Sequence, residues 1–109
     1  MVHSMATIQE VLSGITEELG IPCAYSHFKT AQIPPYIVYI GNGQTQLDGD
    51  NVLTWRRNVY QIEYYFAVKD EDLERDIEDA LIAGGWKFSK SSDSFEQSQG
   101  LFVIFYDVG

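Results

Sequence analysis

The feature that most constrains the fold is a run of β-forming residues from position 52 to position 68. Side chains of a strand point alternately to its two faces, so a half-buried strand is apolar at every second position. One face of this run is apolar or aromatic throughout, at Tyr60, Ile62, Tyr64, Phe66 and Val68. The other face carries Gln61 and Glu63. The pattern therefore predicts a long strand that buries one face.

A second β-forming segment, residues 36–40, follows the doubled proline Pro34-Pro35, which holds the chain extended. Between the two segments, residues 41–51 are polar and contain three glycines. This composition predicts a turn-rich hairpin loop, which we expect to be mobile in the isolated chain and to become ordered against a partner. Our candidate partner-binding residues are five side chains of this loop and two tyrosines of the neighbouring strands, namely Gln44, Gln46, Leu47, Asp48, Asp50, Tyr39 and Tyr65.

Glycines that follow a strand are also typical of a phosphate-binding loop. Such a loop needs a lysine and the N-terminus of a helix at its end, because these donors neutralise the phosphates. Residues 41–51 lead into another strand instead, and Asp48 and Asp50 would repel a phosphate. The sequence therefore favours a hairpin loop over a nucleotide site.

Two helices are predicted from apolar residues at helical spacing. The first is marked by Ile8, Val11, Leu12, Ile15 and Leu19. Thr7 and Glu10 form a capping-box pattern at its start, and Gly20 and Pro22 end it. Leu73, Ile77, Ala80 and Leu81 mark the second helix, whose first turn is acidic and which ends at Gly84-Gly85.

The rest of the chain predicts shorter strands. Residues 22–28 are expected to be a short strand or extended segment, residues 86–90 a strand, residues 91–100 a turn or ragged hairpin, and residues 101–106 a closing apolar strand. The order of elements is then α-β-β-β-α-β-β, an α+β fold with an antiparallel sheet of about four to five strands and two helices. At 109 residues we expect a single domain with a radius of gyration of roughly 13 Å. Residues 1–6 are expected to be disordered or to derive from a tag.

Charge and cysteine content narrow the classes of function. The net charge of −9 argues against nucleic acid as a partner, because phosphate binding needs clustered Lys and Arg and this chain has only the pair Arg56-Arg57. Neither a signal peptide nor a run long enough to cross a bilayer is evident, so we expect a soluble protein without a membrane partner. A single cysteine, Cys23, forms no intrachain disulfide.

Cys23 and His27 are the one pair that suggests metal binding or nucleophilic catalysis. A structural zinc site needs four ligands, and a Cys-His nucleophile needs an orienting third group and an oxyanion hole. The sequence offers no such partners. We therefore expect no metal, no cofactor and no catalytic residues.

Residues 70–79 contain seven of the sixteen acidic residues and a single base, Arg75. The simplest interpretation is the solvated face of the second helix, opposite Leu73, Ile77 and Leu81. The alternative is an acidic docking surface, which would make the chain a binding or inhibitor module for a basic protein.

The closing strand and residues 36–40 are apolar at odd and even positions alike, so both faces of the sheet are apolar there. Two helices can cover one face together or one face each. An uncovered face rich in Tyr39, Tyr65, Phe102 or Ile104 would leave a patch that monomers rarely expose, and a second protein chain would cover it. A packed monomer with one helix on each face remains open.

Several stretches resemble one family. They are residues 20–25 (GIPCAY) with Phe28, residues 34–39 (PPYIVY), residues 60–65 (YQIEYY) and residues 77–81 (IEDAL), with Trp86. In these stretches the chain is similar to the small tail-completion, or tail terminator and tail-to-head joining, proteins of long-tailed phages and prophages. The similarity extends over roughly positions 8 to 106.

The resemblance implies a virion assembly protein. Its fold would be tail-terminator-like, and its subunits would form a homo-oligomer, a hexameric ring, between the tail tube and the head connector. It would act in the host bacterial cytoplasm during assembly and then in the virion. The family brings no catalytic residue to any position of this chain, so the resemblance implies a protein that is not an enzyme.

Overall fold

A computed structural model of the chain describes residues 6–48 and 54–109, with the backbone alone at residues 46–48, 54 and 55. The elements in chain order are α1 (Ile8–Leu19), β1 (Cys23–Tyr25), β2 (Tyr36–Asp48), β3 (Thr54–Phe66), α2 (Glu71–Ala83), β4 (Phe88–Lys90), β5 (Ser94–Glu96) and β6 (Leu101–Val108). The predicted α+β class is confirmed. The sheet has six strands rather than four to five, because part of the polar segment 91–100 forms β5.

The sheet has the strand order β1-β2-β3-β6-β4, and β5 pairs with the first part of β6. All pairs are antiparallel except β1 with β2, which run parallel. The closing strand β6 therefore lies at the centre, between β3 and the short strands β4 and β5. This position explains why β6 is apolar at successive positions.

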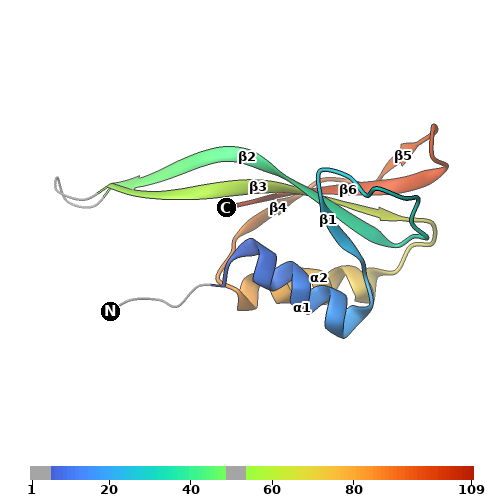
Figure 1. Cartoon of the computed structure of the whole chain (residues 1–109), viewed down its shortest axis with the longest axis horizontal. Helices are drawn as coiled ribbons and strands as arrows, with labels where there is room; N and C mark the ends of the chain where they lie inside the picture. The colour runs from blue at the N-terminus through green and yellow to red at the C-terminus, as the bar shows by residue number, and fades with distance from the viewer. Residues whose placement is uncertain (1–5, 49–53) are drawn as a thin grey trace.

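Both helices lie on one face of the sheet, which we call the helix face (Figure 1). The strand register places Ile37, Ile62, Tyr64, Ile104 and Tyr106 on this face, and all five are at most 1% exposed. They pack against the apolar stripes of the helices, namely Ile8, Val11, Leu12 and Ile15 of α1 and Ile77 and Leu81 of α2. Of the two arrangements that the sequence left open, the structure has both helices on one face, and the described residues place no helix on the opposite face, which we call the open face.

The helix ends follow the sequence signals. Thr7 and Glu10 form the predicted capping box, in which the Thr7 hydroxyl accepts from the Glu10 N–H and the Glu10 carboxylate accepts from the Thr7 N–H. Gly20 ends α1 in the left-handed conformation, with φ 71°. Helix α2 begins after Asp70, whose carboxylate accepts from the Leu73 N–H.

The prediction of a loop over residues 41–51 is wrong for residues 41–48, which continue β2 and pair with β3 as far as Asp48 opposite Thr54. The glycines serve a different purpose. The register shifts between Gly41 and Gln44, and Gly43 has φ 93°, so the run forms a β-bulge inside a long strand. Residues 49–51 of the predicted loop, like residues 1–5, lie outside the described part of the chain.

Two smaller predictions also need correction. Val68 was placed on the buried face of the long strand, but β3 ends at Phe66 and Val68 is 79% exposed. Trp86 was placed in a strand, but β4 begins only at Phe88. Trp86 is buried, and its indole N–H donates to the Ala6 carbonyl at 3.0 Å.

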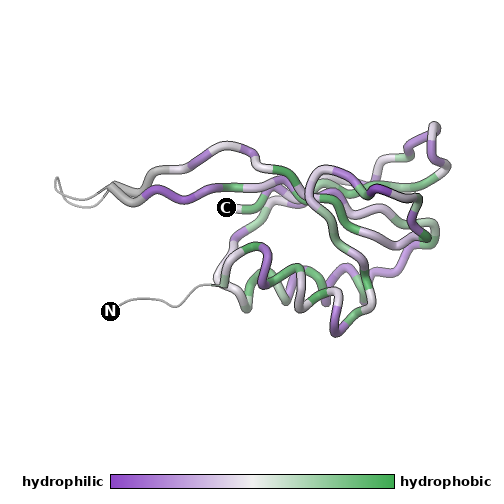
Figure 2. Tube along the Cα trace, in the orientation of Figure 1, coloured by the Kyte–Doolittle hydropathy of each residue, from purple (hydrophilic) through white to green (hydrophobic). Residues whose placement is uncertain are grey.

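The β2–β3 hairpin extends well beyond the helices (Figure 1). We call its outer part, residues 42–48 and 54–59, the arm. The molecule measures 50 × 26 × 26 Å and has a radius of gyration of 15.0 Å, larger than the roughly 13 Å of a compact chain of this length. The helices and the strands beside them carry most of the hydrophobic positions, whereas the arm is mostly hydrophilic (Figure 2).

Candidate functional site

The seven predicted partner-binding residues do not form one site. Tyr39 lies on the helix face, where its ring packs edge-on against Tyr25 and Tyr60. Tyr65 lies on the open face, since it pairs with Tyr36 of β2 and stacks on that ring with centroids 5.1 Å apart. The two tyrosines are thus separated by the sheet, because they occupy positions of opposite parity in the ladder.

The other predicted residues belong to the arm. Gln44 is exposed, and its amide donates to the Asn58 side chain at 3.3 Å across the ribbon. Gln46, Leu47 and Asp48 occupy the next positions of β2, opposite Arg56, Trp55 and Thr54, and their side chains are not described. Asp50 lies outside the described residues.

The two strands of the arm pair only with each other over the part of the chain that the structure describes. On one side, β1 pairs with β2 only as far as Tyr39, and the Tyr25 hydroxyl accepts from the Gly41 N–H at 3.3 Å. On the other side, β6 pairs with β3 only from Tyr60. About seven residues, or roughly 23 Å of ribbon, therefore present two open backbone edges.

The base of the arm is attached to the body by Arg57, whose guanidinium carbon lies 3.5 Å above the centre of the Trp86 ring. The same guanidinium donates to the Gly85 carbonyl at 3.5 Å. Beside it, an open groove of about 380 Å³ separates Arg56 and Tyr60 from the first turn of α1. The arm thus leaves the body at an anchored position.

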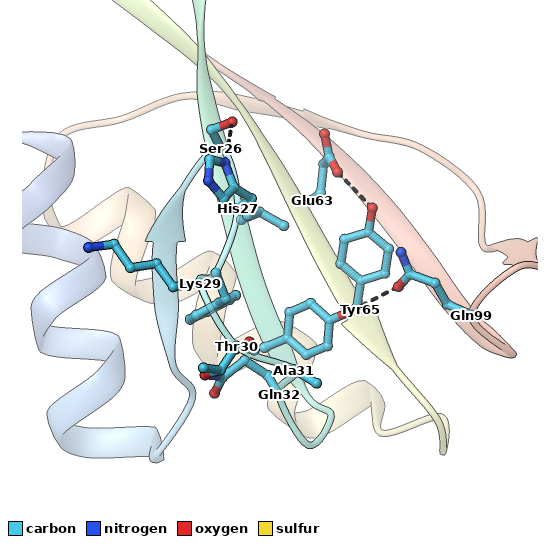
Figure 3. Close-up of a pocket in the computed structure, with 12 residues that line it drawn as sticks. Ser26, His27, Lys29, Thr30, Ala31, Gln32, Glu63, Tyr65 and Gln99 are labelled. Atoms are coloured by element: carbon cyan, nitrogen blue, oxygen red, sulfur yellow. Dashed lines mark hydrogen bonds between the residues drawn. The ribbon is translucent and has the colours of Figure 1, made fainter.

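The open face carries a second hollow, which we call the cup. The chain reverses at Ser26, with φ 66°, and residues 26–32 then pass over the open face beside Tyr36, Val38, Glu63 and Tyr65 (Figure 3). The hollow between this segment and the strands has a volume of about 330 Å³. Phe28 packs edge-on against Tyr36, with ring centroids 5.6 Å apart.

The polar groups of the cup are tied together by hydrogen bonds. The Tyr65 hydroxyl donates to Glu63 Oε1 at 2.8 Å, and the Tyr36 hydroxyl donates to Gln99 Oε1 at 2.9 Å. Partial burial, followed by the bond to the Glu63 carboxylate, raises the pKa of Tyr65, so this hydroxyl stays protonated and remains a donor. The candidates predicted from the sequence include Tyr65 but not Tyr36, Glu63 and Gln99, because residues 63 and 99 come together only through the pairing of β3 with β6.

The acidic segment is only partly a solvated face. Glu74 is 2% exposed and lies between two lysines, with Oε2 at 2.8 Å from Lys69 Nζ and Oε1 at 2.9 Å from Lys90 Nζ. Glu78 is half-buried, lies 2.8 Å from Lys90, and accepts from the Tyr106 hydroxyl. Two of the seven acids therefore attach α2 to the sheet and its neighbouring segments. The sequence contains a signal for this role in the spacing of Glu74 and Glu78 from Leu81, because positions 74, 78 and 81 share one face of a helix.

Cys23 and His27 do not meet at a site. The Cys23 thiol lies on the helix face and donates weakly to the carbonyls of Leu12 and Ile21, and burial raises its pKa. His27 lies beyond the reversal at Ser26, on the side of the cup. Within residues 6–48 and 54–109 there is no group of three side chains suited to a metal ion, and no helix is long and apolar enough to cross a membrane.

Comparisons with known proteins assign no function to this chain, so the functional argument rests on its structure and its residues. The chain matches no family model, and no curated protein is significantly similar to it.

Proposed function

We propose that this chain is a ring-forming subunit for phage or prophage virion assembly, a tail-completion or head–tail joining protein. It would act as a homo-oligomer, a hexamer, that contacts the tail tube, the head connector or both. We infer no catalytic role. The observation that carries the proposal is the arm, which extends from the body with two open backbone edges.

An isolated two-stranded ribbon is at best marginally stable in water, and its free N–H and C=O groups readily pair with another strand. A projecting arm of this kind is therefore expected to pack against a second chain. β-Strand addition is a common way in which one chain holds another. A virion ring, whose subunits contact each other continuously, gives every arm a neighbour.

The open face supports the same function. The described residues place no helix on it, and it carries Ile40 at 41% exposure and, further along the strands, the half-buried Tyr36, Tyr65 and Phe105. Residues 26–32 cover only part of this face, and monomers rarely leave a contiguous apolar patch exposed. The resemblance of several sequence stretches to tail-completion proteins is the reason why we propose this kind of assembly.

The alternative is an acidic binding module that acts through α2. It loses part of its support because Glu74 and Glu78 are directed to Lys69, Lys90 and Tyr106 rather than to a partner. Charge reversal at the exposed Asp72, Asp76 and Asp79 separates the two functions. It would abolish binding of a basic protein by such a module, whereas a ring subunit should still assemble.

The test in the virion uses the phage or prophage that encodes the chain. Deleting the gene should give heads and tails that do not join, or tails of abnormal length, and a plasmid copy should restore normal particles. Electron micrographs of the restored particles should show a sixfold ring at the end of the tail tube. Normal head–tail joining without the protein would contradict the proposal.

A further inference from the structure

We propose that the cup is a binding site for a guanidinium group, and that its occupant is Arg56 on the arm of a neighbouring copy of the chain. The inference rests on the proposed self-assembly and specifies which two surfaces meet. It follows from the chemistry of the cup, from the positions of the cations in the chain and from the distance between Arg56 and Glu63 along β3.

The cup offers acceptors and aromatic surface rather than positive charge. Glu63 uses Oε1 to accept from Tyr65, and among the residues that the structure describes no group donates to its Oε2. After burial, the Glu63 contacts and Tyr36, the charge of Glu96 also helps to raise the pKa of Tyr65, so a second carboxylate adds to the negative potential at the cup. Lys29 lines the cup, but its amino group points away from Glu63 and Tyr65 (Figure 3).

A guanidinium matches this chemistry better than an ammonium. It is planar, so it can lie against a tyrosine ring, and it donates several hydrogen bonds in the plane, so it can bind a carboxylate oxygen and an amide oxygen together. Glu63 and Gln99 supply these two kinds of oxygen at the cup.

Three of the seven cationic side chains of the chain already have a role. Lys69 and Lys90 bind the carboxylates of Glu74, Glu78 and Asp93. Arg57 covers the Trp86 ring. Arg75 lies on α2 among acidic residues, and Lys87 lies beside the C-terminus, where its backbone bonds to Gly109. Arg56 is exposed and lies on the projecting arm, which can enter a hollow on another molecule.

A chain cannot place Arg56 in its own cup. Arg56 and Glu63 both belong to β3, seven residues apart, and an extended strand rises roughly 3.3 Å per residue. The separation of roughly 23 Å exceeds the reach of one arginine side chain. The contact is therefore between two copies and joins two different surfaces, so each copy uses its arm on one neighbour and its cup on the other. Such head-to-tail contacts close into rings when the rotation permits.

The test compares self-association of the intact chain with that of single variants by sedimentation velocity. Arg56→Gln removes the occupant, and Glu63→Arg fills the cup with its own cation. Each should raise the dissociation constant of assembly at least about tenfold, as expected when one partner of a charged interface pair is lost. Arg75→Gln, which removes an exposed cation elsewhere, should leave assembly unchanged. Circular dichroism and thermal unfolding show whether each variant is folded. If Glu63→Arg is not folded, the milder variant Glu63→Gln takes its place.

Mixing the two variants tests the head-to-tail geometry. Glu63→Arg keeps a working arm and Arg56→Gln keeps a working cup, so one contact can form between them and none can follow. At a concentration where each variant alone is monomeric, the mixture should give a species of twice the 12.4 kDa chain mass and nothing larger.

Two outcomes would overturn the inference. If the intact chain assembles and the Arg56 and Glu63 variants assemble equally well, the contact is wrong while the proposed ring function stands. If the intact chain does not assemble at any concentration, the proposed function fails and this contact fails with it.

Discussion

Gly84 lies where helix α1 packs against the C-terminal end of α2, and its lack of a side chain permits that contact. A Cβ atom at this position would lie 2.5 Å from Cγ2 of Val11 and 3.4 Å from the Trp86 ring. The backbone of Gly84 has φ −80°, which any residue adopts. The need for glycine is therefore one of space rather than of backbone conformation.

Gly84→Ala should destabilise the fold by about 1–3 kcal/mol, the usual range for an extra methyl group in a packed contact. Gly14→Ala is the matched control, because Gly14 lies inside α1 and nothing lies within 4 Å of its added Cβ. That change should stabilise the fold by about 0.5–1 kcal/mol, since alanine is the better helix former. Denaturant unfolding of both variants measures the difference, and equal effects of the same sign would refute the assigned α1–α2 packing.

Residues whose role depends on local spacing were predicted correctly. Thr7, Glu10, Gly20 and the apolar stripes of both helices are read within one or two helical turns. Glu74 was misjudged because its two lysine partners come from outside the helix, at positions 69 and 90. Gln99 was missed for a similar reason, since its partner Tyr36 is 63 residues away in the chain. Such contacts are set by the strand order, which local spacing does not contain.

At the level of elements, α2 is held to the sheet by ionic contacts as well as by its apolar stripe. The buried Glu74 lies between Lys69 and Lys90, and both lysines remain partly exposed and keep second partners in Asp93 and Glu78. Removing the carboxylate therefore leaves cations that water can still reach.

Glu74→Ala should lower the free energy of unfolding by about 1–3 kcal/mol, the cost of removing one partner from a buried polar contact. This is less than the 3–5 kcal/mol of a fully buried pair, because the lysines can be rehydrated. Asp76→Ala is the control on the same helix; its exposed side chain should matter by no more than about 0.5 kcal/mol. If both variants melt alike in denaturant, the network adds nothing to stability.

Residues 41–48 of β2, most of which belong to the arm, were wrongly predicted as a loop. Glycine and polar residues are typical of turns, and residues 41–48 contain both, so local composition favoured a loop. The segment is a strand because β3 supplies a paired partner as far as Thr54, and a bulge accommodates the glycines. Pairing with a partner strand outweighed composition here.

The arm can be removed at a defined position. Replacing residues 45–57 with Asn-Gly joins Gln44 to Asn58, which already face each other, through a two-residue hairpin turn. The variant should remain folded and lose about 0.5–1 kcal/mol with the Arg57–Trp86 contact. It should also lose self-association. Circular dichroism and sedimentation measure the two properties, and a folded variant that assembles like the intact chain would exclude the arm as an interface.

For the whole molecule, alkaline pH tests how its buried tyrosines are distributed. Burial, assisted by the charges of Glu74 and Asp70, raises the pKa of Tyr64 to about 12. Burial and then a hydrogen bond to a carboxylate raise the pKa of Tyr65 and Tyr106. Partial burial lowers the pKa of Lys69 and Lys90, but their contacts with carboxylates outweigh it and raise the pKa overall.

Because these groups bind protons more tightly in the folded state, the stability that the tyrosines contribute should be constant below pH ~10, the unfolded tyrosine value, and fall above it. Each tyrosine contributes a slope of at most about 1.4 kcal/mol per pH unit between its unfolded and folded pKa. Denaturant unfolding from pH 8 to pH ~11.5 should show this loss, and Tyr106→Phe should reduce the slope. A stability that does not change across this range would contradict the burial of these hydroxyl groups.

The central claim is that the chain works as an assembled ring, and the mass of the intact protein in solution tests it most directly. Light scattering during gel filtration over a wide range of concentrations measures that mass. The account predicts a discrete species of six times the 12.4 kDa chain mass, in equilibrium with free subunits as the protein is diluted. A particle of one chain mass at every concentration would contradict it.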